Sequence, residues 1–378
     1  MHIVHILKGK ANPETLNGVN KIVHWMATEQ TNQGHDVEVW GITKTVNRLR
    51  TDPYNYKLRF FQQLPFRALI AAELKKAVAE LDINTYAHIH SVFSPEYPSI
   101  ARLLHKRGIV YGVTPHGGYS PGVLRKDRFW KWLYITLRER RYVAGACWAQ
   151  ATGAGEIEDI LAIAPHQKVE LIPNGQERNL LEGVEVPQMA SIHPVIGYCG
   201  RLSILQKGLD FLIEGFSAYK LKGGRGQLWL IGDDVDRPAV ERMVVEGGFK
   251  NDVRFFGAMS GVEKLKVIAN FDIFIHSSRW EGLPMACLEA ASLARPLVVS
   301  RGTNLAKYVE RSGAGLVLRE TSSAGVTEAL EQVDRLYEGN QLRQMSRNAL
   351  SLVEKEFSWE ENARSFVAAA SAAMSAVY

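Results

Sequence analysis

The feature that most constrains the fold of this chain is the alternation of short apolar runs with longer amphipathic runs along nearly its whole length. The apolar runs have the length and β-branched content of buried strands. Amphipathic runs such as Gly208–Lys220 and Gly261–Asn270 lie between them. This alternation predicts parallel sheets with helices on both faces. The predicted strands are His2–Leu7, Asp36–Ile42, His88–Phe93, Ile109–Thr114, Cys147–Thr152 and Val169–Pro173, then Val195–Cys199, Gln227–Gly232, Val253–Phe256, Ile273–Ser277, Pro296–Ser300 and Gly315–Leu318.

The length of the chain, 378 residues, predicts two domains, because one ordinary hydrophobic core does not grow so large. The rhythm of strands and helices breaks between Gln176 and Pro194, a stretch with two prolines and no clear period. We therefore expect domains at 1–187 and 188–357, followed by a terminal segment at 358–378. Ligands of such folds lie at the carboxyl ends of the strands, so a cleft between the two domains is the expected site.

Composition excludes several classes of protein. Apolar content is 46% and charged content 22%, as in ordinary globular proteins, and no apolar stretch reaches the roughly 18 residues of a membrane span. The N-terminus enters a strand at once, which predicts no signal peptide. The net charge of +5 fits an acidic ligand or an anionic membrane surface and is too small to indicate a nucleic acid partner.

The cysteines and histidines predict no tightly held metal. The three cysteines, Cys147, Cys199 and Cys287, are odd in number and lie in apolar segments. They read as buried free thiols in a reducing compartment, which favours a cytoplasmic location. No pair of histidines or carboxylates has the spacing of metal ligands.

The segment Ser278–Ala290 carries the most specific pattern. Two glutamates, Glu281 and Glu289, stand eight positions apart, and a Gly-Leu-Pro tripeptide follows the first. A strand is predicted before it and a helix from Pro284, with proline in the first turn. The helix start favours an anion, while the two carboxylates suit sugar hydroxyls and a ribose diol. The alternative is two ordinary glutamates on a helix surface.

Two cations follow the strand Val195–Cys199 on one loop. Arg201 stands directly after Gly200, and Lys207 stands before Gly208, where the next helix opens. A pair of cations at the carboxyl end of a strand suits a diphosphate. The alternative is a pair of solvated surface charges.

In the first half, Gly18 and His116 are the candidate site residues. Gly18 follows the first strand and permits close approach to phosphate, although an ordinary turn is an equal alternative. His116 is followed by two glycines at the end of a strand, where it can bond a sugar hydroxyl or move a proton; a structural histidine is the alternative. For His88 and His90, core packing is favoured. The chain has neither a G-x-G-x-x-G motif after a strand nor a P-loop motif.

The segment Arg125–Arg141 combines seven cations and two acids with large apolar residues, among them Trp130 and Trp132. Basic and aromatic residues together on a helix favour an anionic membrane surface. The alternative is a core helix with a solvated basic face.

Together these motifs resemble the retaining glycosyltransferases of family 4, which have the GT-B fold. The resemblance covers nearly the whole chain. It rests on the first strand with its glycine loop, His116-Gly-Gly, Ile172-Pro-Asn-Gly175, Gly200-Arg201, Lys207-Gly208, Leu230-Ile-Gly-Asp233, Phe256-Gly257, the two-glutamate segment and Phe357-Ser-Trp-Glu360.

The resemblance implies an α/β fold of two doubly wound, Rossmann-like domains that face each other across a cleft, with the C-terminal helix from Ser358 crossing back to the N-terminal domain. It also implies retaining transfer of a hexose from a nucleoside diphosphate sugar. We expect UDP-glucose or a similar UDP-sugar, without a metal or other cofactor. The expected acceptor is a hydroxyl of a growing glycan or a lipid-linked molecule, in polysaccharide biosynthesis. The expected location is the cytoplasm, with peripheral attachment to the inner face of the membrane.

The family's site residues carry over by position. Arg201 and Lys207 match cations that neutralise the leaving diphosphate, and His116 matches a histidine beside the donor sugar. Glu281 matches a carboxylate near the sugar hydroxyls, and Glu289 matches the one on the ribose. The matching backbone positions are Gly282, Leu283 and Pro284, expected to offer N–H groups, Gly18, expected to close on phosphate, and Gly232 and Gly257, expected to bind the nucleotide sugar.

Two departures and two alternative functions accompany the resemblance. Many members have two glycines where this chain has Asn17-Gly18, and many have a glutamate near Thr303–Lys307, where this chain has none. A UDP-sugar epimerase of the same fold would bind the same donor without forming a glycosidic bond. A non-catalytic nucleotide-sugar-binding protein is the other alternative.

Overall fold

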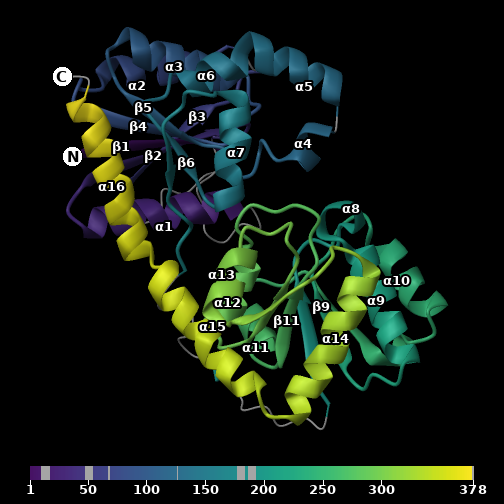
Figure 1. Ribbon diagram of the computed structural model, residues 1–378. Helices are drawn as coiled ribbons and strands as arrows, with labels where there is room; N and C mark the ends of the chain where they lie inside the picture. Colours follow the sequence, from purple (N-terminus) through teal and green to yellow (C-terminus); the bar gives the residue numbers. More distant parts are fainter. Residues whose placement is uncertain are drawn as a thin grey trace. The chain divides into compact units, whose positions relative to one another are not determined.

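The computed structural model describes residues 1–9, 18–46, 54–66, 69–125, 127–176, 184–185 and 193–376. The chain divides into two compact units (Figure 1). The first comprises Met1–Gly175 together with Trp359–Tyr378, and the second comprises Gln176–Ser358. The expected domain boundary between residues 187 and 188 lies outside the described residues.

The first unit is built on a seven-stranded sheet of order β3-β2-β1-β4-β5-β6-β7, in which all neighbouring strands are parallel. Its elements are β1 (His2–Lys8), α1 (Gly18–Asn32), β2 (Asp36–Thr43), β3 (Lys57–Gln62), α2 (Ala72–Glu80), β4 (Thr85–His90), α3 (Glu96–Lys106), β5 (Tyr111–Thr114), α4 (Pro121–Arg125), α5 (Arg128–Tyr134), the π-helix η1 (Ile135–Glu139), α6 (Arg140–Ala144), β6 (Ala149–Ala151), α7 (Ala154–Ile163) and β7 (Val169–Leu171).

Three local expectations for the first unit need correction. The edge strand β3 was not predicted, because Lys57 and Arg59 make it too polar to read as a buried strand. The strand predicted at His88–Phe93 is β4, which begins and ends three residues earlier, since Ser91 and Phe93 adopt positive φ. The basic segment is divided into α4, α5, η1 and α6, and Asp127 has φ 54° at the start of α5.

The second unit has a six-stranded sheet of order β10-β9-β8-β11-β12-β13, again with parallel neighbours. All six strands were predicted to within two residues. The elements are β8 (Val195–Cys199), α8 (Ile204–Lys207), α9 (Leu209–Leu221), β9 (Gln227–Ile231), α10 (Arg237–Glu246), the 3₁₀-helix η3 (Lys250–Asp252), β10 (Val253–Gly257), α11 (Gly261–Ile268), β11 (Ile273–His276), α12 (Met285–Ser292), β12 (Leu297–Val299), α13 (Ala306–Ser312), β13 (Gly315–Val317), α14 (Ser323–Glu338) and α15 (Leu342–Glu356).

Helices cover both faces of this second sheet. On β11, Phe274 belongs to one buried apolar cluster, and its neighbours Ile273 and Ile275 belong to another. Because successive side chains of a strand point to opposite faces, the two clusters are the two cores of a doubly wound sheet. The first sheet also reverses its strand order, between β1 and β4, so the expected α/β fold of two doubly wound domains is confirmed for each unit.

The terminal helix α16 (Trp359–Ser375) belongs to the first unit, as expected, and lies beside α1 (Figure 1). Its Phe366 is fully buried, with ring centroids 4.7 Å from His88 and 5.2 Å from Trp148. Near the start of the helix, Gln33 Nε2 donates to the Glu360 carbonyl at 2.9 Å.

Among the described residues, no helix is both long enough and apolar enough to cross a bilayer. Cys147, Cys199 and Cys287 form no disulfide within the described part of the chain; the last two are buried and the first is partly buried.

Candidate functional site

The order of the second sheet brings the two predicted loops together. The chain runs from β8 outward to β9 and β10, then returns to β11 on the other side of β8. The loops after β8 and β11 therefore meet at the topological switch point, where open α/β sheets bind ligands. Ser277 Oγ donates to the carbonyl oxygens of Lys207 and Gly208, at 3.2 and 3.0 Å.

Gly208 is required by this contact. It has φ 63°, and a Cβ atom there would lie 2.4 Å from the Ser277 carbonyl oxygen. A larger residue would push the two loops apart. The glycine therefore fixes the position of Lys207, directly before it, against the loop that carries Glu281.

Lys207 and Glu281 form an ion pair at this point. Lys207 is only 8% exposed. Burial by itself raises the pKa of Glu281, but His276 and Lys207 outweigh burial and lower the pKa to about 2. Glu281 is therefore a carboxylate throughout the physiological range.

His276 completes this group and was not predicted. It is the last residue of β11, is 1% exposed, and places Nε2 3.6 Å from Glu281 Oε2. Its ring stacks on Tyr198 with centroids 5.7 Å apart. Both ring nitrogens are buried without a hydrogen bond. Burial, the largest cause, lowers its pKa.

Arg201 lies on the same loop as Lys207 but is more open. Its guanidinium donates to Gln206 Oε1 at 2.6 Å and lies 3.6 Å from Asp234 Oδ2. The side chain is mostly exposed. An exposed guanidinium with weak partners can turn toward a phosphate at small cost.

Glu289 is held by a residue that the sequence did not single out. Lys264 Nζ, on α11, lies 2.7 and 2.6 Å from the two carboxylate oxygens of Glu289. Both side chains are buried, each 8% exposed. Burial lowers the Lys264 pKa, but the nearby Glu289 outweighs this, and the net pKa lies above its ordinary value. The sequence pattern that could have identified Lys264 is its position four residues before Ile268, on the buried side of the helix.

The predicted glycines mark close backbone approaches at neighbouring strand ends. Gly232 has φ 143°, and a Cβ atom there would lie 1.8 Å from the Gly200 carbonyl oxygen. Gly257 has φ 75°, and its carbonyl accepts from Gly232 N at 2.8 Å. The ends of β8, β9 and β10 are thus joined through glycine, and binding of the nucleotide sugar by Gly232 and Gly257 stays a prediction.

One predicted backbone contact is wrong. Proline has no N–H, so Pro284 cannot donate to a ligand. It lies just before α12, with φ −74° and ψ 107°. The Glu281 N–H already donates to the Gly302 carbonyl at 2.9 Å. The N–H groups of Gly282 and Leu283 remain the predicted donors of this loop.

The predicted His116 belongs to the first unit, at the carboxyl end of β5. It has φ 52°, and Gly117 after it has φ 73°. Together with Ser91 and Phe93 it forms a group of left-handed residues after β4 and β5, and such strain gathers at functional sites. Burial lowers the His116 pKa to about 4, so the ring is neutral near pH 7.

Glu139, on the π-helix η1, ties these two turns together and was not predicted. Its Oε1 accepts from the Phe93 N–H at 3.0 Å and from the Tyr119 hydroxyl at 2.9 Å. The residue is fully buried, and burial raises its pKa to about 7. π-Helical turns occur frequently at functional sites.

Gly18 is the first residue of α1 and is exposed, and the loop before it lies outside the described residues. Its predicted contact with phosphate stays a prediction.

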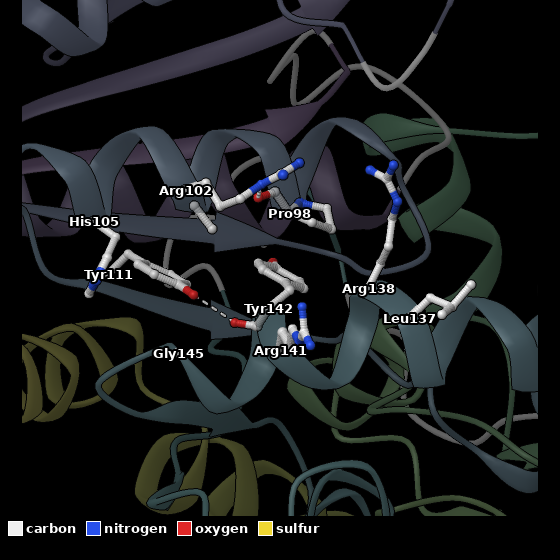
Figure 2. A pocket seen from close by; sticks show the side chains of 10 residues that line it. Pro98, Arg102, His105, Tyr111, Leu137, Arg138, Arg141, Tyr142 and Gly145 are labelled. Atoms are coloured by element: carbon white, nitrogen blue, oxygen red, sulfur yellow. Dashed lines mark hydrogen bonds between the residues drawn. The ribbon is translucent and has the colours of Figure 1, made fainter.

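The basic segment borders a groove of about 430 Å³ between α3 and the η1–α6 stretch (Figure 2). Arg102, Arg138 and Arg141 line it without any carboxylate, and the Tyr111 hydroxyl donates to the Tyr142 carbonyl at 2.7 Å. Upstream on α5, Phe129, Trp130 and Trp132 are 64%, 69% and 59% exposed. The alternative that these tryptophans are core residues is excluded.

Within the described residues, no three histidine, cysteine or acidic side chains come together as a metal site. Independence from metal therefore stays a prediction.

Comparison with known proteins gives a consistent result for both units. Residues 16–178 match the family model described as "Glycosyltransferase Family 4", and residues 193–335 match "Glycosyl transferases group 1". The alpha-D-kanosaminyltransferase of Streptomyces kanamyceticus is 28% identical over 166 residues, which span 44% of this chain and only 42% of that protein. The GDP-mannose:cellobiosyl-diphosphopolyprenol alpha-mannosyltransferase of Xanthomonas campestris is 22% identical over 350 residues, covering 88% of this chain and 87% of that protein.

Among solved structures, Anabaena HepE in complex with UDP-glucose aligns with a TM-score of 0.74 at 15% identity, over 98% of this chain and 99% of that chain. This likeness shows the fold. The two matched domains and the fold define a glycosyltransferase. The chain belongs to the family 4 glycosyltransferases with the GT-B fold, as the resemblance of its motifs predicted.

Proposed function

We propose that this glycosyltransferase moves a hexose from a UDP-sugar, such as UDP-glucose, to a hydroxyl of a growing glycan or lipid-linked acceptor, with retention at the anomeric carbon and without a metal. The observation that carries the proposal is the buried Lys207–Glu281 pair beside His276 at the switch point of the second sheet. A buried ammonium next to glycine-rich strand ends is built to receive a diphosphate.

The chemistry follows from where charge develops. The bond between the anomeric carbon and the diphosphate oxygen breaks, and a bond from the acceptor oxygen to the same carbon forms. The departing diphosphate gains negative charge, which the buried Lys207 and the exposed Arg201, turned toward the phosphate, stabilise. The acceptor attacks from the face that the diphosphate leaves, and a phosphate oxygen takes the acceptor's proton.

Glu281 acts in this proposal as a positioning group and not as a covalent nucleophile. Its carboxylate is already paired with Lys207 and lies near His276, and its pKa of about 2 reflects that stabilisation. A carboxylate so strongly stabilised is a weak nucleophile but a good acceptor for sugar hydroxyls. We propose that donor binding lets Lys207 share its charge between Glu281 and the diphosphate.

The choice of UDP rests on fold-level likeness. HepE, which shares the fold, was solved with UDP-glucose, whereas the Xanthomonas campestris relative is named for GDP-mannose. Glu289, fixed by Lys264, is proposed to bind the ribose that both nucleotides share. The protein must then distinguish UDP from GDP by contacts to the base, away from Glu289.

The acceptor is proposed to be lipid-linked and reached from an anionic membrane surface. The Xanthomonas relative is named for a diphosphopolyprenol acceptor. In this chain, three arginines line a groove between α3 and the η1–α6 stretch (Figure 2), and the helix that precedes η1 in the chain, α5, carries exposed aromatic residues. Cations beside exposed aromatic rings suit the boundary between lipid headgroups and acyl chains.

The proposed function is tested by titrating the full chain with a panel of UDP- and GDP-sugars and then assaying transfer to lipid-linked acceptors. We expect one UDP-hexose to bind and to give a product with the donor's anomeric configuration, read by NMR of the new linkage. An inverted linkage or a GDP-sugar preference contradicts the corresponding part. A donor that is epimerised without acceptor, or bound without reaction, favours one of the two alternative functions.

A further inference from the structure

Four side chains form one continuous line of hydrogen bonds inside the first unit. Gln30 Oε1, on α1, lies 2.7 Å from His5 Nε2, and His5 Nδ1 lies 2.9 Å from His90 Nε2. His90 Nδ1 lies 3.1 Å from His116 Nε2. The first three residues are 2% exposed or less, and His116 is partly exposed. The line therefore begins in the core and ends at the predicted site histidine.

All three imidazoles in this line are neutral near pH 7. Burial is the largest cause for each: it lowers the pKa of His5 and of His116 to about 4, and the pKa of His90 well below its ordinary value. A neutral imidazole carries one N–H, so one of its nitrogens donates and the other accepts.

The position of each proton then follows from the first bond. The carbonyl oxygen of Gln30 can only accept, so His5 carries its proton on Nε2 and accepts through Nδ1. His90 Nε2 must then donate to His5, which leaves His90 Nδ1 as an acceptor. His116 Nε2 must in turn donate to His90. His116 is left with an unprotonated Nδ1.

We propose that Gln30, His5 and His90 are positioning residues that hold His116 in its Nε2–H tautomer, so that Nδ1 is presented to a ligand as a hydrogen-bond acceptor. The His116 backbone, strained at φ 52°, fixes the ring further. No described residue donates to Nδ1. A hydroxyl group can donate a hydrogen bond to this nitrogen. A group that only accepts, such as a carboxylate, is repelled by the lone pair of the nitrogen.

The ligand in this inference rests on the proposed function, in which the hydroxyl belongs to the donor sugar. The tautomer does not, because it is a property of the free protein. The two parts are therefore measured separately.

The tautomer is read by long-range proton–nitrogen correlation NMR on the full chain carrying ¹⁵N-histidine, with the His116 signals assigned by their loss in His116→Gln. We expect His116 to show a protonated Nε2 and an unprotonated Nδ1 without any ligand. Gln30→Leu removes the first link of the line, and His5→Phe removes the first two. In either variant we expect the Nδ1–H form of His116 to become populated.

His24→Gln is the matched control, because His24 is a buried histidine on the same helix as Gln30, bonded to the Tyr56 hydroxyl and outside the line. It should leave the His116 tautomer unchanged. A wild-type His116 protonated on Nδ1 overturns the proposal, and so does an unchanged tautomer in folded Gln30→Leu and His5→Phe.

The ligand part is tested with the same labelled protein. UDP-glucose should shift the His116 Nδ1 resonance toward that of a hydrogen-bonded nitrogen, and UDP alone should not. A bound UDP-glucose that leaves this resonance in place contradicts the hydroxyl contact. If no nucleotide sugar binds, the proposed function fails while the measured tautomer still decides the proposal for the free protein.

Discussion

Lys264 holds both oxygens of Glu289, at 2.7 and 2.6 Å, although Glu289 is the carboxylate expected on the ribose. The pair is buried between α11 and α12 and belongs to two elements that are adjacent in the fold. A ribose diol that bonds Glu289 must therefore share the carboxylate with an ammonium. Lys264 holds Glu289 in one orientation before a nucleotide arrives.

Breaking this pair should be costly in the free protein. In Lys264→Met, Glu289 is left as a buried carboxylate without its partner, and such a loss typically costs roughly 3–5 kcal/mol in the free energy of unfolding. The double variant Lys264→Met/Glu289→Gln should recover much of that loss, because the unpaired charge is gone. Denaturant unfolding of both variants measures the difference.

The matched control is Lys266→Met, two residues along the same helix, where an exposed lysine pairs with Glu263 at 2.8 Å. Exposed pairs contribute about 0–1 kcal/mol, so this variant should be close to wild type. Equal losses for Lys264→Met and Lys266→Met would show that the buried pair has no special role in stability.

Removing either of the two predicted diphosphate cations should lower turnover, but the two substitutions should differ in their effect on stability. Arg201→Ala and Lys207→Ala each remove a cation aimed at developing charge, which typically costs roughly a hundredfold or more in turnover. Lys207→Ala should also destabilise the fold, since it leaves Glu281 unpaired, while Arg201→Ala should not, because Arg201 is mostly exposed. Turnover is measured with the donor saturating.

Lys222→Ala serves as the control, since Lys222 is an exposed cation of the same unit that pairs with Glu331. It should leave turnover unchanged. Near-normal turnover in both Arg201→Ala and Lys207→Ala would sink their assignment to the diphosphate.

Much of the second unit was predictable from sequence because its signals are local. Each strand is a short apolar run, and the rule for switch points places the loops of Lys207 and Glu281 side by side once β8 and β11 are recognised as strands. The glycines at 208, 232 and 257 follow the same logic, since each allows a backbone conformation that other residues resist.

What escaped prediction depends on contacts between distant elements. Lys264, His276 and Glu139 are buried polar residues whose partners lie on other elements, and periodicity alone reads such positions as core. The histidine line needs the register of β1 against β4, which places His5 opposite His88 and within reach of His90. No pattern of residues along the chain predicts the register of β1 against β4.

Glu139 predicts a dependence of stability on pH. Its folded pKa of about 7 lies above the ordinary value of 4.5, so folding favours the protonated carboxyl. This stabilisation is fully present below about pH 4.5 and is lost as the pH rises through 7. The glutamine of Glu139→Gln cannot titrate, so this variant does not lose that stabilisation. The free energy of unfolding of the variant minus that of wild type should therefore rise by about 3 kcal/mol from pH 4.5 to 8.

Unfolding curves of wild type and variant at each pH measure this difference. The difference is the useful quantity, because Glu156 is also buried with a pKa raised to about 7 and contributes to both proteins alike. Glu73→Gln, an exposed carboxyl at the start of α2, is the control and should show no such change. A flat difference for Glu139→Gln would mean that this carboxyl has the same pKa in the folded and the unfolded chain.

Transfer should persist without metal. The proposal assigns the neutralisation of the diphosphate to Lys207 and Arg201, and a divalent ion would do the same work. We expect turnover after exhaustive chelation to equal turnover with added magnesium or manganese. Activity lost on chelation and restored by manganese would show that the site is misread.

The basic segment should bind anionic membranes through a defined part of its surface. Each cation near an anionic surface contributes about 1 kcal/mol, and exposed Trp130 and Trp132 add interfacial anchorage. We expect the full chain to float with vesicles containing anionic phospholipid, to bind neutral vesicles less, and to be released by salt.

Arg138→Gln/Arg141→Gln removes two cations of the groove and should weaken flotation. The matched control, Lys75→Gln/Lys76→Gln, removes the same charge from exposed residues of α2 and should not weaken it. Equal flotation with anionic and neutral vesicles at low salt, or equal losses in the two double variants, would show that the groove and its aromatic neighbours do not attach the enzyme to a membrane.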